Sequence, residues 1–94
     1  MRLDQFLRAS RIIPRRTVAQ ELCDAGAVAV NGVAARSSRA VRAGDEISLR
    51  RRDRLTSVRV VGVPAARNVS KAEAAALYET LRDERTRDDD DDPA

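Results

Sequence analysis

The 94-residue chain has no histidine and no tryptophan, and Cys23 is its single cysteine. These absences exclude a disulfide framework, zinc sites built from cysteine and histidine, Cys/His nucleophile pairs and histidine acid–base catalysis. Cys23 lies in a helical stretch beside Leu22 and Ala25, where we interpret it as a small packing residue. We therefore expect no catalytic residues, no metal site and no cofactor.

Aromatic residues and long apolar runs are also scarce. One Phe and one Tyr cannot form the aromatic platform on which many RNA-binding sheets stack bases, so arginine must carry any such recognition. The first residues lack the apolar stretch of a signal peptide, and no run approaches the length of a membrane span. The sequence predicts one small cytoplasmic domain that contacts no membrane.

Lysine is nearly absent, whereas arginine is abundant and its charge is segregated along the chain. Residues 1–69 contain 14 arginines, no lysine and 6 acidic residues, which gives a net charge of +8, and residues 70–94 have a net charge of −5. Genome composition explains why arginine replaces lysine, but it does not explain this segregation. The basic part is the candidate binding region, because a basic surface attracts polyanions.

Two helices are predicted within the first 25 residues. Apolar residues at helical spacing define the first helix, from about residue 2 to residue 10: Leu3, Phe6 and Leu7. The second helix is expected to begin at Pro14, whose missing N–H needs no partner at a first helical position, and to end before Gly26. Its inward-facing residues are expected to be Val18, Leu22 and Ala25.

After Gly26 the hydrophobic period changes to two, which predicts strands. Asn31-Gly32 is a dipeptide preferred in two-residue hairpin turns, and it lies between an alternating run at residues 28–30 and a short return strand at residues 33–36. A second turn is expected at residues 42–45, before a strand that contains Ile47 and Leu49. Another strand fits residues 56–61, and together these predict a small, mostly antiparallel sheet.

A further helix is predicted over residues 70–86. Ser70 is a candidate N-cap with Glu73 three residues later, and an apolar stripe follows with Ala74, Leu77, Tyr78 and Leu81. We expect this helix to pack on a domain made of residues 1–69. Residues 87–94 are expected to be a disordered acidic tail, since the run Asp88–Asp92 cannot bury anything; a metal-binding cluster is the alternative.

Pro14-Arg15-Arg16-Thr17 is the most informative segment for function. Two arginines at a helix start, where free N–H groups and the macrodipole are already positive, cost stability unless an anion binds. Guanidinium groups form paired hydrogen bonds with phosphates, which suits the shape of A-form RNA. We therefore predict an RNA-binding surface with these candidate residues: Arg2, Arg8, Arg11, Arg15, Arg16, Arg36, Arg39 and Arg42. The run Arg50-Arg51-Arg52 and Arg54 fit a second contact or a solubilising turn equally well.

The order of these elements resembles the αL RNA-binding domain named after small-subunit ribosomal protein S-four, over residues 1–50. That domain is an α+β fold with two N-terminal helices packed on a small sheet, here with a C-terminal helix added. A closer likeness within this superfamily is carried by the following segments: Met1-Arg2-Leu3-Asp4-Gln5-Phe6-Leu7, Arg15-Arg16-Thr17-Val18-Ala19, Gly26, Val30-Asn31-Gly32, Gly44-Asp45-Glu46-Ile47 and Glu73-Ala74-Ala75-Ala76-Leu77-Tyr78. In these segments the chain is similar to the bacterial ribosome quality control protein P family, RqcP, and to the small heat-shock ribosome-binding proteins.

The resemblance implies a protein that does no chemistry and binds obstructed large ribosomal subunits. It implies contacts with large-subunit rRNA and with P-site peptidyl-tRNA, while the NEMF-like partner RqcH brings alanyl-tRNA for alanine tailing of the stalled chain. The free protein is expected to be a monomer. Three alternatives stay open: a heat-shock-type recycling factor that binds large subunits with peptidyl-tRNA, a module that binds an acidic protein, and an accessory subunit of a separate enzyme.

Overall fold

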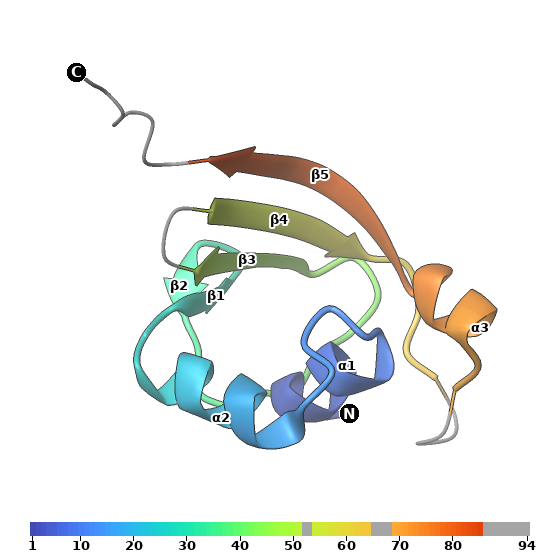
Figure 1. Cartoon of the computed structure of the whole chain (residues 1–94), viewed down its shortest axis with the longest axis horizontal. Helices are drawn as coiled ribbons and strands as arrows, with labels where there is room; N and C mark the ends of the chain where they lie inside the picture. The colour runs from blue at the N-terminus through green and yellow to red at the C-terminus, as the bar shows by residue number, and fades with distance from the viewer. Residues whose placement is uncertain (52–53, 65–68, 86–94) are drawn as a thin grey trace.

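The structure, a computed structural model, describes residues 1–51, 54–64 and 69–85. These residues form three helices and a five-stranded antiparallel sheet, joined by loops and turns (Figure 1). The predicted α+β class is therefore confirmed. Along the sheet the strand order is β2-β1-β3-β4-β5. The elements are α1 (Leu3–Ala9), α2 (Arg16–Asp24), β1 (Val28–Val30), β2 (Val33–Ala34), β3 (Glu46–Arg51), β4 (Arg54–Val60), α3 (Lys71–Ala75) and β5 (Tyr78–Arg85).

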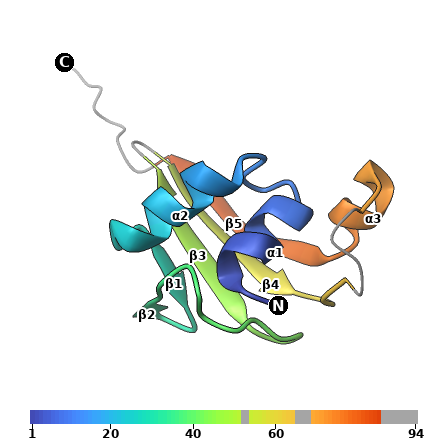
Figure 2. The ribbon, with the colours of Figure 1, turned by 90° about the horizontal axis from the view of Figure 1, so that it is seen from below.

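The core lies between the sheet and the two N-terminal helices, which cover one face of it (Figure 2). Alternate residues of β1, β3 and β4 face α1 and α2 because side chains alternate along a strand. Burial, together with the charges of Asp4 and Asp24, raises the pKa of the Cys23 thiol to about 11, so Cys23 is an inert packing residue, as predicted. The largest contributors to this core are Leu3, Phe6, Leu7, Ile13, Val28, Val30, Ile47 and Val60.

Both predicted turns are present, and they contact each other. Asn31 and Gly32 have positive φ values of 53° and 85°, as the two-residue hairpin between β1 and β2 requires. Gly44 has φ 94° in the turn before β3. The Asn31 side chain donates to Asp45 Oδ1 at 3.2 Å and accepts from the Glu46 N–H at 2.9 Å. This contact fixes the register of β1 against β3.

Helix α2 begins two residues later than the sequence predicts, since Arg15 is extended (φ −105°, ψ 123°) and Arg16 is the first helical residue. The linker before it is held by Ile13, which is 1% exposed and donates its N–H to the Leu7 carbonyl at 3.1 Å. The buried residues of α2 are Ala19 and Cys23, whereas the predicted inward residue Ala25 is exposed. At the other end the predicted left-handed residue is confirmed, because Gly26 has φ 80°.

The C-terminal helix is shorter than predicted, and the prediction of a helix over 70–86 is wrong after residue 75. The Ser70 hydroxyl accepts from the Glu73 N–H at 3.1 Å, as expected for the capping box, but α3 ends at Ala75. Residues 78–85 form β5, which pairs with β4 from Val60↔Tyr78 to Arg54↔Arg85. The backbone groups along the edge of β4 need partners, and this need outweighs the helical spacing of the apolar residues.

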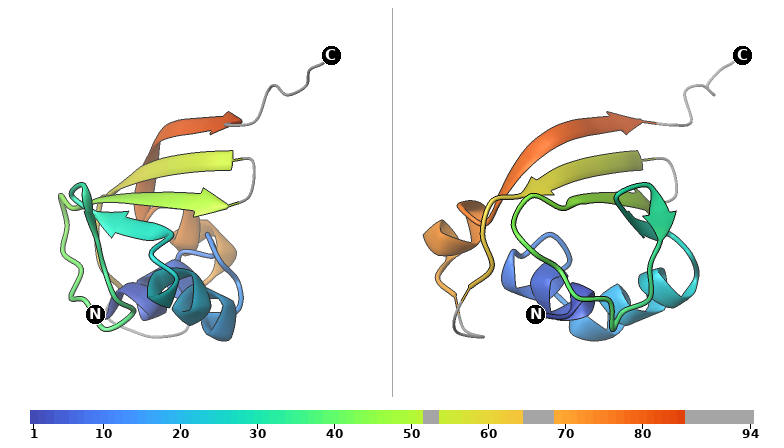
Figure 3. Two further views of the ribbon diagram at one scale, coloured as in Figure 1. Left: turned by 90° about the vertical axis from the view of Figure 1, so that its left-hand side faces the viewer. Right: turned by 180° about the vertical axis from the view of Figure 1, so that it is seen from behind.

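Strand β5 begins near α3 and runs along β4 to the opposite end of the sheet (Figure 3). Helix α3 itself lies beyond one end of the sheet, beside the α1 end of the molecule. The acidic tail predicted for residues 87–94 lies outside the described residues. None of the helices in the described ranges is long and apolar enough to cross a membrane.

Candidate nucleic-acid interface

A fully buried carboxylate organises the start of both N-terminal helices. Asp4, in the first turn of α1, has 0% of its side chain exposed. Its Oδ1 accepts from Arg2 Nε at 3.2 Å, and its Oδ2 accepts from Arg16 Nε at 3.3 Å and from Gln20 Nε2 at 2.9 Å. We call these four residues the Asp4 cluster. Arg16 and Gln20 are one helical turn apart on α2, which places both on the side that meets α1.

The electrostatics of the Asp4 cluster favour an ionised carboxylate. Burial raises the pKa of Asp4, but the hydrogen bonds from Gln20 and Arg16, the charge of Arg2 and the Gln5 backbone N–H together outweigh burial, so the pKa lies below its ordinary value. Two guanidinium groups share this single negative charge, and their side chains are 45% and 44% exposed. The cluster therefore presents a net positive charge to solvent with both guanidinium groups held in place.

A segment after β2 pairs with the chain start and brings further arginines beside the Asp4 cluster. The Leu3 N–H donates to the Arg39 carbonyl at 2.7 Å, and the Asp4 N–H donates to the Ser37 carbonyl at 3.2 Å. Arg2 also forms an isolated β-bridge with Ala40. These contacts satisfy the free N–H groups at the start of α1. They also bring the backbone segment that contains Arg39 beside the one that contains Arg2.

The remaining arginines near this segment are exposed. Arg15 is the N-cap of α2, and its side chain makes no capping hydrogen bond. Arg36 and Arg39 belong to one turn, in which the Arg39 N–H donates to the Arg36 carbonyl at 3.0 Å. A hydrogen bond from the Arg42 backbone N–H lowers the pKa of Asp45, and the charges of Arg39 and Arg42 lower it further.

Arg8 and Arg11 lie at the other end of α1, away from the Asp4 cluster. Arg8 is exposed in the last turn of the helix, where a positive charge suits the macrodipole. Arg11 adopts a left-handed conformation with φ 63°, and its Nη2 donates to the Val69 carbonyl at 3.2 Å. Arg11 thus joins the end of α1 to the segment before α3, a structural contact that the sequence did not indicate.

Sequence reasoning missed the partner of Arg16. It predicted an unpaired cation at a helix start, but Arg16 is bound to Asp4. Gln20 was also missed, although it makes the shortest side-chain bond of the Asp4 cluster. One signal was present: an acidic residue beside Leu3 in an apolar helix turn must be paired if it is buried. The described residues contain no group of histidine, cysteine or acidic side chains placed to hold a metal ion.

Comparisons with known proteins identify the family of this chain. The S4 domain family matches residues 1–47. A protein of Halalkalibacterium halodurans named RQC P-site tRNA stabilizing factor is 43% identical over 84 residues, which cover 89% of this chain and 93% of that protein. The protein of the same name from Bacillus subtilis is 41% identical over 85 residues and covers 90% and 96%. This chain belongs to that family.

Membership of the family makes the chain an S4-type RNA-binding protein of ribosome quality control. The S4 match includes the whole Asp4 cluster and all eight candidate arginines, from Arg2 to Arg42. The fold is also similar to Heat Shock Protein 15 of Vibrio cholerae, which was solved as a trimer. The TM-score is 0.77 with 30% identity, over 86% of this chain and 81% of that one.

Proposed function

We propose that the chain stabilises P-site peptidyl-tRNA on obstructed large ribosomal subunits by binding RNA phosphates with the Asp4 cluster. The observation that carries the proposal is the pairing of two guanidinium groups with one buried carboxylate. Such a group keeps a positive charge and holds its hydrogen-bond donors in fixed directions, which suits backbone phosphates whose spacing is set by A-form geometry. The name of the relatives, P-site tRNA stabilizing factor, agrees with this ligand.

The neighbouring arginines extend this surface. Arg15 and Arg16 adjoin at the start of α2, and Arg39 lies beside Arg2 through the backbone pairing of the two segments. Arg36 and Arg42 belong to the same stretch of chain as Arg39. Contacts of this kind position a protein on RNA without reading its sequence. The protein would thus hold tRNA against large-subunit rRNA and do no chemistry of its own.

In this proposal the chain acts as a monomer in the cytoplasm together with RqcH, the NEMF-like factor that brings alanyl-tRNA. RqcH must exchange tRNA at each round of alanine addition, and a bound peptidyl-tRNA that shifts would end the tail. A second protein that holds the tRNA from its phosphates permits repeated rounds, because it leaves the reacting ends of both tRNAs uncovered.

The experiment that tests this function is sedimentation with purified large subunits that carry or lack peptidyl-tRNA. We expect the wild-type chain to bind both, and to bind the tRNA-containing subunits more tightly. The double variant Arg2→Ala/Arg16→Ala is expected to lose both interactions, whereas Arg54→Ala/Arg59→Ala, which removes two arginines of β4, serves as the matched control. Equal binding of the double variant and the control would contradict the proposal.

A second candidate function is the recycling of large subunits after heat shock, which the TM-score of 0.77 with Heat Shock Protein 15 favours. The two functions differ in their dependence on RqcH. A reconstituted reaction with obstructed subunits, RqcH and alanyl-tRNA should form longer alanine tails when this chain is added. Release of the peptidyl-tRNA without longer tails would instead support the recycling function.

A further inference from the structure

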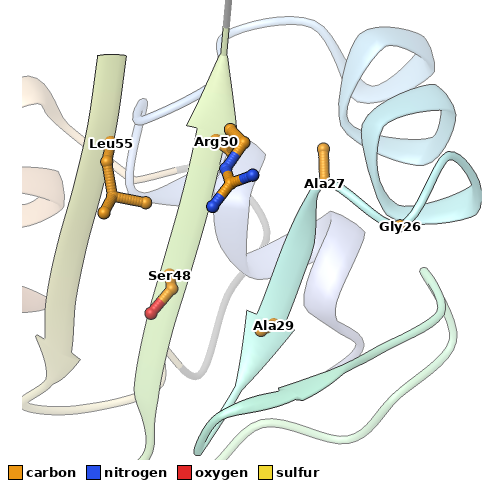
Figure 4. Close-up of a pocket in the computed structure, with 6 residues that line it drawn as sticks. All are labelled: Gly26, Ala27, Ala29, Ser48, Arg50 and Leu55. Carbon is orange, nitrogen blue, oxygen red and sulfur yellow. The ribbon is translucent and has the colours of Figure 1, made fainter. Parts of the chain in front are cut away.

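The sheet face that points away from α1 and α2 contains a hollow of about 270 Å³. Val28, Ile47 and Leu49 are buried toward the helices, so the residues that alternate with them point to this outer face. The hollow is lined by Gly26, Ala27, Ala29, Ser48, Arg50 and Leu55, and we call it the outer pocket (Figure 4). Its position separates it from the Asp4 cluster, which lies between the helices on the other side of the sheet.

Arg50 differs from the other arginines on this outer face. Arg59 pairs with Glu79 at 3.8 Å, and Arg82 pairs with Glu84 at 3.4 Å. Within the described ranges, Arg50 forms no ion pair, and its side chain is exposed. Figure 4 shows its guanidinium group at the hollow, between the side chains of Leu55 and Ala27. Because it is exposed and lies at the hollow, this guanidinium group can contact a ligand of the outer pocket.

The backbone around Arg50 is fixed. Its N–H donates to the Ala27 carbonyl at 2.8 Å, and Arg50 pairs with Leu55 across β3 and β4. Apart from Leu55, the other residues of the outer pocket have small side chains or none, which leaves room above the strands for a flat group. Ser48 adds a hydroxyl, which lies 3.3 Å from the Ser57 hydroxyl and can exchange that bond for one to a ligand.

The planar guanidinium group of Arg50, beside small apolar side chains and a hydroxyl group, suits the binding of an unpaired nucleobase. Proteins bind the unstacked bases of RNA loops on aromatic rings or on arginine guanidinium planes, and hydrogen-bond their edges. This chain has almost no aromatic residues, so arginine is the side chain left for stacking. The outer pocket, with a volume of about 270 Å³, leaves space for one base.

We propose that the outer pocket binds one unpaired nucleobase of an RNA loop, stacked on Arg50. The proposal rests on the RNA-binding function above and deepens it, because the molecule then contacts RNA on two sides. The Asp4 cluster holds phosphates, and the outer pocket captures a base from a loop that reaches around the sheet. The target is thereby restricted to RNA with an accessible unpaired nucleotide.

The test compares two RNA hairpins that have the same stem and the same number of phosphates. One carries normal bases in its loop, and the loop of the other is abasic. We expect the full-length wild-type chain to bind the hairpin with bases about tenfold more tightly, since stacking of one base contributes roughly that factor. The slope of affinity against salt should be the same for both hairpins, because their phosphate contacts are equal in number.

Two variants change the outer pocket in different ways. Arg50→Lys keeps the charge but removes the planar group, and Ala29→Leu fills the hollow from β1. Both are expected to reduce the preference for the base-containing loop to less than about twofold. Arg59→Lys is the control, since it makes the same change at a paired arginine of the same face. Thermal unfolding of each variant confirms that the fold is retained.

The outcomes separate this inference from the proposed function. Equal binding of the two hairpins by the wild-type chain would overturn the inference, as would an unchanged preference in both pocket variants. Binding of large subunits by the same proteins is measured in parallel. If the variants lose the base preference while wild-type protein does not sediment with subunits, the outer pocket stands and the ribosomal function fails.

Discussion

Arginines lie both on the helical side of the molecule and on the β4–β5 side, but they pair with acidic residues differently on the two sides. At the helices, two arginines share the one buried carboxylate of Asp4. Along β4 and β5, Arg54, Arg59 and Arg82 each pair with an exposed acidic residue of β5. The first arrangement leaves a net positive charge and holds both guanidinium groups in fixed directions, whereas the second neutralises each arginine with one carboxylate. The number of arginines is therefore a poor guide to where a polyanion binds.

The largest effect is expected from removing the shared arginines. Arg2→Ala/Arg16→Ala should weaken binding to large subunits by at least about a hundredfold, because each of the two lost charge-assisted hydrogen bonds to phosphate contributes about 1.5–3 kcal/mol. The slope of log affinity against log salt should fall by about 1.5, at roughly 0.7–0.9 for each phosphate contact. Filter binding over a range of salt concentrations measures both quantities.

The matched comparison is Arg54→Ala/Arg59→Ala, which removes the same charge from the β4–β5 side. Its affinity should stay within about twofold of wild type, since both side chains are already paired with carboxylates. A similar loss in the two double variants would mean that net charge, and not its arrangement, determines binding. Arg16→Glu is a poor substitute for the alanine change, because it places a second carboxylate beside buried Asp4.

Asp4→Asn tests whether the arrangement of charge matters more than its amount. The change raises the net charge by one, yet we expect affinity to fall roughly threefold to tenfold because the two guanidinium groups lose their fixed directions. The free energy of unfolding should fall by about 1–3 kcal/mol, since buried hydrogen bonds are lost. Denaturant unfolding and filter binding are the measurements. Tighter binding by Asp4→Asn would contradict the role assigned to the carboxylate.

The stability of wild type and Asp4→Asn at acidic pH tests the role of the Asp4 charge directly. The folded pKa of Asp4 lies below its ordinary value of 3.8, so its ionised form stabilises the fold above that pH and the contribution is lost as the pH falls below it. The difference in unfolding free energy between wild type and Asp4→Asn should therefore shrink as the pH falls below about 4. A difference that stays constant with pH would show that the aspartate charge is not involved.

The smallest effect is expected at the exposed pair of Arg59 and Glu79. Their side chains are 50% and 59% exposed, so Glu79→Gln should change the free energy of unfolding by less than about 1 kcal/mol. The same change leaves Arg59 unpaired and should slightly raise salt-sensitive binding to RNA of any sequence. A loss of several kcal/mol would show that this pair is not the weak, exposed contact described here.

Local signals allowed much of the fold to be predicted from sequence. The Asn31-Gly32 hairpin, the turn at Gly44 and the alternation through Ile47 each depend on conformational preferences of a few adjacent residues. Membership of an S4-type family was likewise indicated by short motifs, and the relatives confirm it. These features were predictable because competing interactions from distant parts of the chain do not change them.

Distant interactions explain the failures. Residues 78–85 have helical spacing, but the open edge of β4 pairs with them as a strand. The Asp4 cluster joins residues 12 and 16 positions apart, so no local pattern links Asp4 to Arg16 or Gln20. The binding roles of the eight candidate arginines stay predictions. Five of them lie at the start of α1, at the start of α2 or in the turn after β2: Arg2, Arg15, Arg16, Arg36 and Arg39.

The S4 match ends at residue 47, inside β3, which spans Glu46–Arg51. Leu49, two residues beyond that limit, is 4% exposed and pairs with Thr56 of β4, and Val58 and Val60 of β4 complete the same core. A fragment cut at the family boundary would expose this half of the core and leave β1 without most of its neighbour. The segment that matches the S4 family is thus smaller than the segment that builds the core, so residues 48–60 are needed to complete the fold.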